Sequence, residues 1–120
     1  MGLEWSIDGR YSLQTLILLK AQNRGKIRPV LVISSEEINK ILPVVNVLPI
    51  TSKKENRQIY SNEVMLPKGT ANMDRDSIIL CYQIRTLDKI RLIKDIGQIK
   101  EDLLKKKVLD ALAFQLEIYS

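Results

Sequence analysis

The feature that most constrains the fold is an apolar run that ends in a polar and cationic patch. The run begins at Ile78 and ends at Cys81, and Gln83, Arg85 and Thr86 follow shortly after it. An uninterrupted apolar run of this length is typical of a strand that is covered on both faces. We therefore predict a buried strand over residues 77–84, with polar side chains presented at its end, where functional sites tend to be built.

Shorter runs rich in β-branched residues predict the rest of a sheet. Further strands are expected at residues 30–33, 44–50, 63–66 and 89–93. Ser34 and Glu37 have the spacing of a helix capping box. This spacing predicts a short helix between the first two of these strands, ending before Pro43.

The period of the apolar residues changes near the C-terminus. Apolar residues recur there at every fourth position, with two more beside them: Leu104, Val108, Leu112 and Leu116, then Leu103 and Ala111. This pattern is typical of an amphipathic helix, and the lysines at 105–107 are then the solvated middle of that helix. Many short strands with one terminal helix predict a mainly β fold, a small curled antiparallel sheet, as a single domain over residues 1–120.

The absence of histidine removes several kinds of chemistry. Histidine triads, the most frequent general base and most zinc sites are excluded, and we expect neither a metal nor another cofactor. The single cysteine, Cys81, excludes an internal disulfide, and its place in the apolar run predicts a buried, inert thiol. The net charge of +5 is compatible with a nucleic-acid partner. Aromatic residues make up only 5% of the chain, which argues against an RNA-binding platform of stacked rings.

Nothing in the chain predicts export or insertion into a membrane. Residues 1–5 lack the basic start and apolar core of a signal peptide. The apolar patch from Leu16 to Leu19 has the length of a strand, far below that of a membrane span. We expect a cytoplasmic protein.

Three segments carry a resemblance to a known family. They are RPVLVIS from Arg28, NKILPVVNVLPITS from Asn39 and RDSIILCYQIRTLDKIRL from Arg75, and the amphipathic helix follows them. In this order and spacing they resemble the MazF/PemK family of toxin endoribonucleases, over about residues 25–118. The resemblance implies an SH3-like small barrel of antiparallel strands with a short helix and a C-terminal amphipathic helix, as in MazF, PemK and CcdB toxins.

The resemblance also implies two catalytic residues. Arg28 falls on the family's catalytic arginine and Thr51 on its catalytic threonine. An arginine is planar and always charged, so it can hold a phosphate with two donors. A neighbouring hydroxyl can orient a phosphate oxygen or the 2′-hydroxyl of RNA. Without the resemblance, a surface arginine and a turn threonine would be the simpler interpretation.

Five further residues are candidate substrate contacts: Ser52, Tyr82, Gln83, Arg85 and Thr86. The amide of Gln83 can read a base edge, and Arg85 can hold a phosphate or form a structural salt bridge. Tyr82 stands where familiar family members carry an acidic residue. It is expected either to stack on an exposed base or to pack under the groove with its hydroxyl bonded to the backbone.

Two functions remain open from the sequence. The first is a metal-independent, sequence-selective endoribonuclease, a homodimer that cleaves single-stranded RNA such as mRNA and is neutralised by a cognate antitoxin. The alternative is a non-catalytic homologue that binds RNA or an antitoxin. Arg28 and Thr51 favour the enzyme. Departures from the family pattern in the loop at residues 21–26 and at Tyr82 favour the alternative. The opening Gly9-Arg10-Tyr11 departs from the pattern as well.

Overall fold

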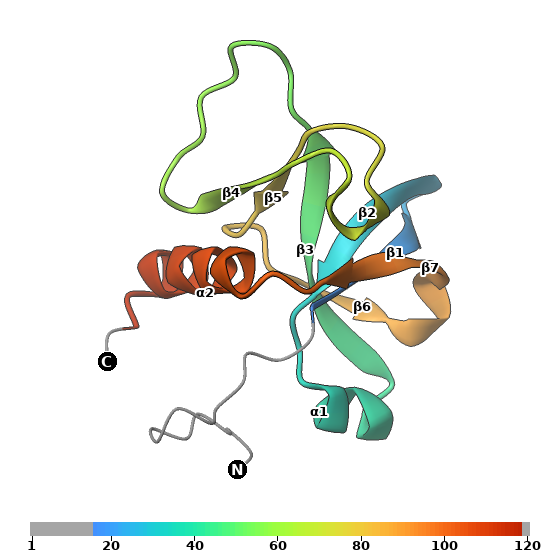
Figure 1. Cartoon of the computed structure of the whole chain (residues 1–120). Coiled ribbons are helices and arrows are strands. Elements are labelled where there is room, and N and C mark those ends of the chain that lie inside the picture. The colour runs from blue at the N-terminus through green and yellow to red at the C-terminus, as the bar shows by residue number, and fades with distance from the viewer. Residues whose placement is uncertain (1–15, 119–120) are drawn as a thin grey trace.

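The computed structural model describes residues 16–118, apart from the side chain of Asn23. The expectations for residues 1–5 and for Gly9-Arg10-Tyr11 therefore lie outside the described residues. The elements, in chain order, are β1 (Leu16–Asn23), β2 (Lys26–Val32), α1 (Glu36–Ile41), β3 (Val44–Ser52), β4 (Glu63–Leu66), η1 (Thr70–Asn72), β5 (Ser77–Leu80), β6 (Arg85–Asp88), η2 (Lys89–Arg91), β7 (Leu92–Ile99) and α2 (Asp102–Leu116) (Figure 1).

The described strands form one strongly curved antiparallel sheet. Its order is β4-β5-β3-β2-β1-β7, and β6 pairs with β3 beside this path. The two end strands, β4 and β7, do not pair with each other, so the described part of the barrel is not closed. The predicted fold class, mainly antiparallel β with a short helix and a C-terminal helix, is confirmed.

The central strand, β3, changes partner once along one of its edges. On that edge residues 44–47 pair with β6 and residues 50–52 pair with β5, whereas residues 47–49 pair with β2 on the other edge. The β2–β3 ladder ends at Val30 and Pro49. Proline has no N–H to donate to a ladder, and Pro29 and Pro49 both lie at this end. The two strands therefore separate there, which leaves room for a cleft.

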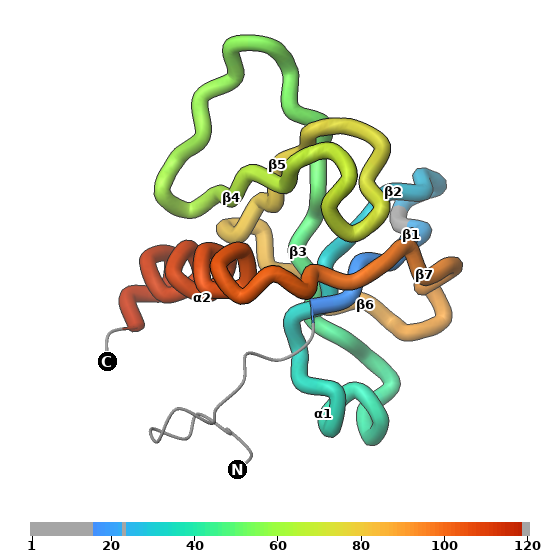
Figure 2. Tube along the Cα trace, viewed as in Figure 1, coloured from blue at the N-terminus to red at the C-terminus, as the bar shows by residue number. Residues whose placement is uncertain are grey.

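The predicted strand over residues 77–84 is wrong in its second half. The chain turns after β5, where the Gln83 N–H donates to the Leu80 carbonyl at 3.1 Å. A new strand, β6, then begins at Arg85. The two strands pair with opposite ends of β3, so the turn carries the chain from one end to the other (Figure 2). Residues 89–93 also differ from the prediction, because η2 precedes β7.

Two apolar clusters lie on opposite faces of the sheet. The larger includes Leu31 and Leu48 and is covered by α2, whose Val108 and Ala111 are buried. The smaller includes Val30 and Val47. Successive residues of a strand point to opposite faces, which explains why neighbours in sequence belong to different clusters. Leu104 and Leu112 pack as the helical period predicts, whereas Leu103 and Leu116 are exposed.

The short helix predicted before Pro43 is present as α1, but the predicted capping residue, Ser34, is wrong. The hydroxyl of Ser35, one residue later than predicted, accepts a hydrogen bond from the Ile38 N–H at 3.2 Å. The Ser34 hydroxyl instead accepts the Asn46 N–H at 3.0 Å and donates to Asn39. Ser34 therefore joins α1 to β3 and does not cap the helix.

Candidate functional site

A cleft opens where β3 leaves β2 and turns toward β5. It has a volume of about 400 Å³, and we call it the β2–β3 cleft. Its apolar base is made by residues of the smaller cluster, including Val30, Val47 and Leu87. Its polar lining consists of Arg24, Lys26, Arg28, Thr51, Gln83 and Arg85.

Arg28 and Thr51 come together because of strand register and alternation. The register that pairs Val30 with Pro49 would, if continued by two residues, place Arg28 opposite Thr51. Arg28 is two positions from Val30, and Thr51 is two positions from Pro49. Val30 and Pro49 both line the cleft, and every second residue of a strand points to the same face. Both line the β2–β3 cleft. Arg28 is exposed and Thr51 is partly buried, so both can be reached by a ligand.

Gln83, in the turn between β5 and β6, and Arg85, the first residue of β6, line the same cleft. The Arg85 guanidinium donates a long hydrogen bond of 3.4 Å to the side-chain oxygen of Gln83. This contact orients the Gln83 amide, whose oxygen accepts from Arg85 while its NH₂ group points its donors elsewhere. The structure thus brings four of the seven predicted site residues into one cavity: Arg28, Thr51, Gln83 and Arg85.

The other three predicted site residues lie outside the β2–β3 cleft. Ser52 is the exposed last residue of β3. Tyr82 is exposed in the turn between β5 and β6. Thr86 lines a neighbouring groove, and its hydroxyl accepts a hydrogen bond from the Asn46 side chain at 2.9 Å. This bond gives Thr86 a structural role in holding β6 to β3.

Sequence reasoning missed Arg24 and Lys26 at the mouth of the cleft. They belong to the tight hairpin between β1 and β2, in which Arg24 and Gly25 both have positive φ, 53° and 76°. Two central residues of positive φ are typical of a type I′ hairpin turn. The sequence signal for this turn was Gly25, which follows two polar residues and stands between two strands. The turn directs two cations toward the site.

The cleft continues into the neighbouring groove that holds Thr86. This groove has a volume of about 660 Å³ and shares Arg24 and Arg85 with the cleft. Arg91 extends it, and its guanidinium donates to the Gln22 carbonyl at 3.5 Å. No carboxylate is among the described residues that line the β2–β3 cleft, and Asp88 is the one acid in the groove. The combined surface is suited to an anion with several negative groups.

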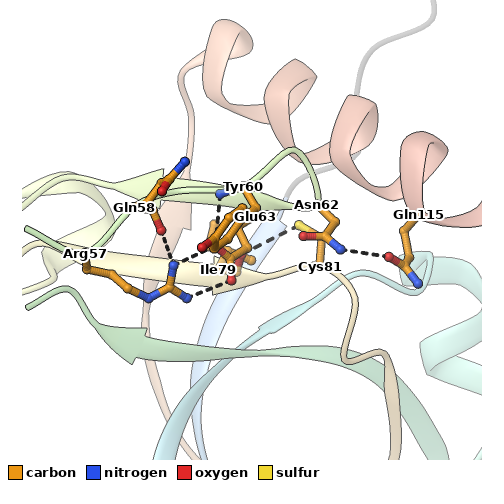
Figure 3. A network of polar contacts seen from close by, with 8 residues as sticks. All are labelled: Arg57, Gln58, Tyr60, Asn62, Glu63, Ile79, Cys81 and Gln115. Carbon is orange, nitrogen blue, oxygen red and sulfur yellow. Dashed lines mark hydrogen bonds and ion pairs between the residues drawn. The ribbon is translucent and has the colours of Figure 1, made fainter.

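A second polar network lies beside this region, around Glu63 (Figure 3). Both carboxylate oxygens accept hydrogen bonds from Arg57, and one also accepts the Tyr60 N–H at 3.1 Å. The Arg57 guanidinium donates as well to the Gln58 carbonyl. The hydrogen bond from Arg57 lowers the pKa of the Glu63 carboxyl, although burial of the group acts in the opposite direction.

Cys81 is fully buried next to this network, as predicted. Burial, with a smaller effect of the Glu63 charge, raises the pKa of its thiol to about 12. The thiolate is the reactive form of cysteine, so this thiol is inert at neutral pH. Over residues 16–118, no group of three or more Asp, Glu or Cys side chains is placed to hold a metal ion. None of the described helices is long and apolar enough to cross a membrane.

Comparisons with known proteins give consistent matches. The pattern of a family described as PemK-like, MazF-like toxin of type II toxin-antitoxin system matches residues 16–116. The chain is 35% identical over 98 residues to a protein named Endoribonuclease MazF from Staphylococcus saprophyticus, a match that spans 82% of this chain and 81% of the relative.

Solved structures share the fold at lower sequence identity. The Mycobacterium tuberculosis toxin MazF-mt6 superposes with a TM-score of 0.74 at 22% identity, over 87% of this chain and 99% of the toxin. An endoribonuclease in complex with its cognate antitoxin, from a mycobacterial species, also gives 0.74, at 18% identity over 87% and 94% of the two chains. A MazE-MazF structure from Deinococcus radiodurans gives 0.68 at 24% identity, over 90% and 96%.

Proposed function

Because this chain belongs to the PemK-like, MazF-like family of toxins from type II toxin–antitoxin systems, we propose that it is an endoribonuclease that cleaves single-stranded RNA. The observation that carries this proposal is the joint presence of Arg28 and Thr51 in the β2–β3 cleft, under a rim of further cations. Such a cleft attracts the phosphate backbone and leaves bases free for recognition.

The nucleophile is the RNA's own 2′-hydroxyl. The 2′-oxygen forms a bond to phosphorus, and the bond from phosphorus to the 5′-oxygen breaks. Water accepts the proton of the 2′-hydroxyl and water donates a proton to the leaving 5′-oxygen, since no carboxylate is among the described residues that line the cleft. Arg28 stabilises the additional negative charge on the phosphorus oxygens in the transition state. The Thr51 hydroxyl orients a phosphate oxygen or the 2′-hydroxyl for attack.

The remaining polar groups of the cleft supply binding and selectivity. The Gln83 amide reads a base edge, and its hydrogen bond with Arg85 limits the orientations that the amide can adopt. Arg24, Lys26 and Arg91 bind backbone phosphates on either side of the reacting one. The cleavage is therefore sequence-selective and independent of metal ions.

The protein acts as a homodimer, in the cytoplasm, and a cognate antitoxin neutralises it. Large apolar side chains remain exposed on the described surface, above all Ile90 with 90% of its area accessible. Exposed apolar side chains of this size can be covered when two subunits or a partner meet. Ile41 and Ile93 are exposed as well. A two-fold dimer would cover part of this surface and leave a separate apolar strip for an antitoxin segment that folds on binding. A monomer in sedimentation at micromolar concentration would contradict the dimer.

The alternative is a non-catalytic homologue that binds RNA or an antitoxin. The absence of an acidic side chain at the Tyr82 position favours it. The experiment that separates the two is incubation of the pure protein with a long RNA, with and without excess chelator. Fragments with defined ends in both conditions support the proposed endoribonuclease. Intact RNA with measurable RNA binding supports the alternative, and cleavage only after magnesium is restored contradicts metal independence.

A further inference from the structure

Two tyrosines and an arginine lie beside the β2–β3 cleft. The described part of the chain contains three aromatic residues, Tyr60, Tyr82 and Phe114. Tyr60 lies within the segment that carries Arg57 and Glu63, and Tyr82 lies in the turn that is bonded to Asn62 of this segment. We call Arg57, Tyr60 and Tyr82 the tyrosine–arginine platform.

Arg57 holds the Tyr60 ring in place. The central carbon of its guanidinium lies over that ring, 5.7 Å from the centroid, a distance at which a cation is attracted to the face of a ring. The guanidinium is itself fixed by two hydrogen bonds to Glu63, whose side chain is only 2% exposed. A buried carboxylate therefore anchors a cation that covers one face of Tyr60, while the residue as a whole remains 57% exposed.

Tyr82 lies at the start of the turn between β5 and β6, and this turn is bonded to the segment that carries Glu63. The Cys81 N–H donates to the Asn62 carbonyl at 3.1 Å, which fixes the turn against the residue before Glu63. Tyr82 follows directly and is 41% exposed. Hydrogen bonding to Glu63 raises the pKa of Arg57, and the nearby Tyr60 and Tyr82 phenols add smaller increases. The Tyr60 ring thus contacts the guanidinium, and Tyr82 stands in the turn that is fastened beside Glu63.

We propose that the tyrosine–arginine platform stacks an unpaired base of the RNA next to the nucleotide that is cleaved. The inference rests on the proposed endoribonuclease function and adds a subsite to it. An exposed ring whose other face is held by a cation is ordered before the base arrives, so little conformational entropy is lost on stacking. Stacking tolerates any base, since every base has a flat face.

The position of the platform favours RNA over a protein partner. Gln83, the residue after Tyr82, lines the β2–β3 cleft, so the platform and the proposed base-reading group are adjacent in the chain. Thr51, on the other side, is followed within two residues by the loop that leads to Arg57. An RNA strand with its reacting phosphate at Arg28 and Thr51 would therefore pass the platform with its neighbouring nucleotide.

The test uses short single-stranded RNAs that contain the cleavage site mapped for the wild-type protein or, if it cleaves nothing, the RNA segment that it protects in footprinting. The 2′-hydroxyl of the reacting nucleotide is replaced by hydrogen, so that binding is measured without cleavage. The fluorescent base 2-aminopurine is placed in turn at each flanking position, because its emission is quenched when it stacks on another ring. We expect quenching at one flanking position.

Four variants and one matched control examine the rings. Tyr60→Ala and Tyr82→Ala should relieve the quenching and weaken RNA binding by about 5- to 150-fold for the loss of one base–aromatic stack. Tyr60→Phe and Tyr82→Phe keep the ring and should bind as the wild type does. Phe114→Ala removes the third aromatic side chain, which is 58% exposed on α2, and should leave RNA binding unchanged. Circular dichroism checks that each variant folds.

The outcomes separate the platform from the proposed function. If the wild-type protein cleaves RNA and Tyr60→Ala shows the same quenching and affinity, the platform is wrong and the endoribonuclease stands. If the protein cleaves nothing but Tyr60-dependent quenching persists, the platform stands and the endoribonuclease fails. Loss of antitoxin binding in Tyr60→Ala, with RNA binding intact, would assign these rings to a protein interface and overturn the proposal. If Tyr82→Phe loses turnover at unchanged affinity, the hydroxyl takes part in the reaction and Tyr82 leaves the platform.

Discussion

The guanidinium of Arg57 binds both oxygens of the Glu63 carboxylate, at 3.0 and 2.8 Å. Glu63 is the first residue of β4 and is buried, whereas Arg57 lies in the loop that connects β3 to β4 and is partly exposed. The pair therefore fastens a long surface loop to the edge of the sheet. In Figure 1 this loop projects from the end of β3 opposite α1, where the backbone alone gives it little support.

Replacement of Arg57 by alanine should destabilise the fold. Removal of Arg57 leaves the Glu63 carboxylate buried without its charged partner, and the exposure of Arg57 to solvent lessens the loss of stability. Urea unfolding measures it. Asp110→Asn, which breaks the exposed pair between Lys106 and Asp110, is the control and should change the free energy of unfolding by at most about 1 kcal/mol. Equal effects of the two substitutions would remove the special role of the Arg57–Glu63 pair.

The contribution of this pair should also depend on pH. The pKa of Glu63 is lower in the folded protein than its ordinary value of 4.5, so the unfolded chain binds the proton more tightly. The stabilisation is therefore complete above the ordinary value and is lost as the pH falls through the lower, folded-state pKa. The difference in unfolding free energy between wild type and Arg57→Ala should be largest at neutral pH and shrink in acid. A constant difference would contradict this.

Gly97→Ala should destabilise the protein by overpacking. A Cβ atom at Gly97 would lie 2.7 Å from the Ala71 carbonyl oxygen, in a turn where Ala71 and Asn72 have positive φ. The Asn72 side chain also donates to the Ile96 carbonyl at 2.8 Å, so the turn cannot easily move away. Overpacking of this kind typically costs about 1–3 kcal/mol. Thermal unfolding measures the loss, and Gln98→Ala, at the exposed neighbouring position, is the control.

Arg28→Ala should abolish cleavage and leave the fold intact. Loss of one preorganised donor for transition-state charge typically costs roughly 3–4 kcal/mol, and Arg28 is exposed, so its packing contributes little. Arg28→Lys should restore little activity, because an ammonium lacks the two-pronged geometry of the guanidinium. Single-turnover cleavage measures both variants. Arg75→Ala, an exposed arginine outside the cleft, should cut normally; wild-type rates in folded Arg28→Ala would remove Arg28 from the mechanism.

Thr51→Val should lower turnover far more than it lowers RNA affinity. Valine keeps the branched shape that suits the end of β3 and removes only the hydroxyl. Thr51→Ser returns a hydroxyl and should recover part of the rate. The comparison needs the single-turnover rate and the dissociation constant of the same RNA. An unchanged rate in Thr51→Val would reduce Thr51 to a turn residue.

Local chemistry along the chain determined much of the fold in advance. Apolar residues that recur at every fourth position around Val108 predicted α2 and its buried face. The short runs rich in β-branched residues predicted β2, β3 and β4. The placement of Arg28 before Pro29 and of Thr51 after Pro49 marked the two strand ends that meet in the β2–β3 cleft. These signals act within a few residues, through side-chain alternation and the missing N–H of proline, so the sequence alone reveals them.

The tertiary structure decided which segments meet. Nothing in the apolar run shows that β5 and β6 pair with different ends of β3, because a local pattern carries no information about a strand's partner. The same holds for Arg24 at the mouth of the cleft and for the bond between Asn46 and Thr86. Arg57 lies in a loop without a periodic pattern and Glu63 follows six residues later as the first residue of β4, and only the burial of Glu63 at that strand makes their pairing favourable. Burial and register are properties of the whole chain, and they select one arrangement among the many that each short segment allows.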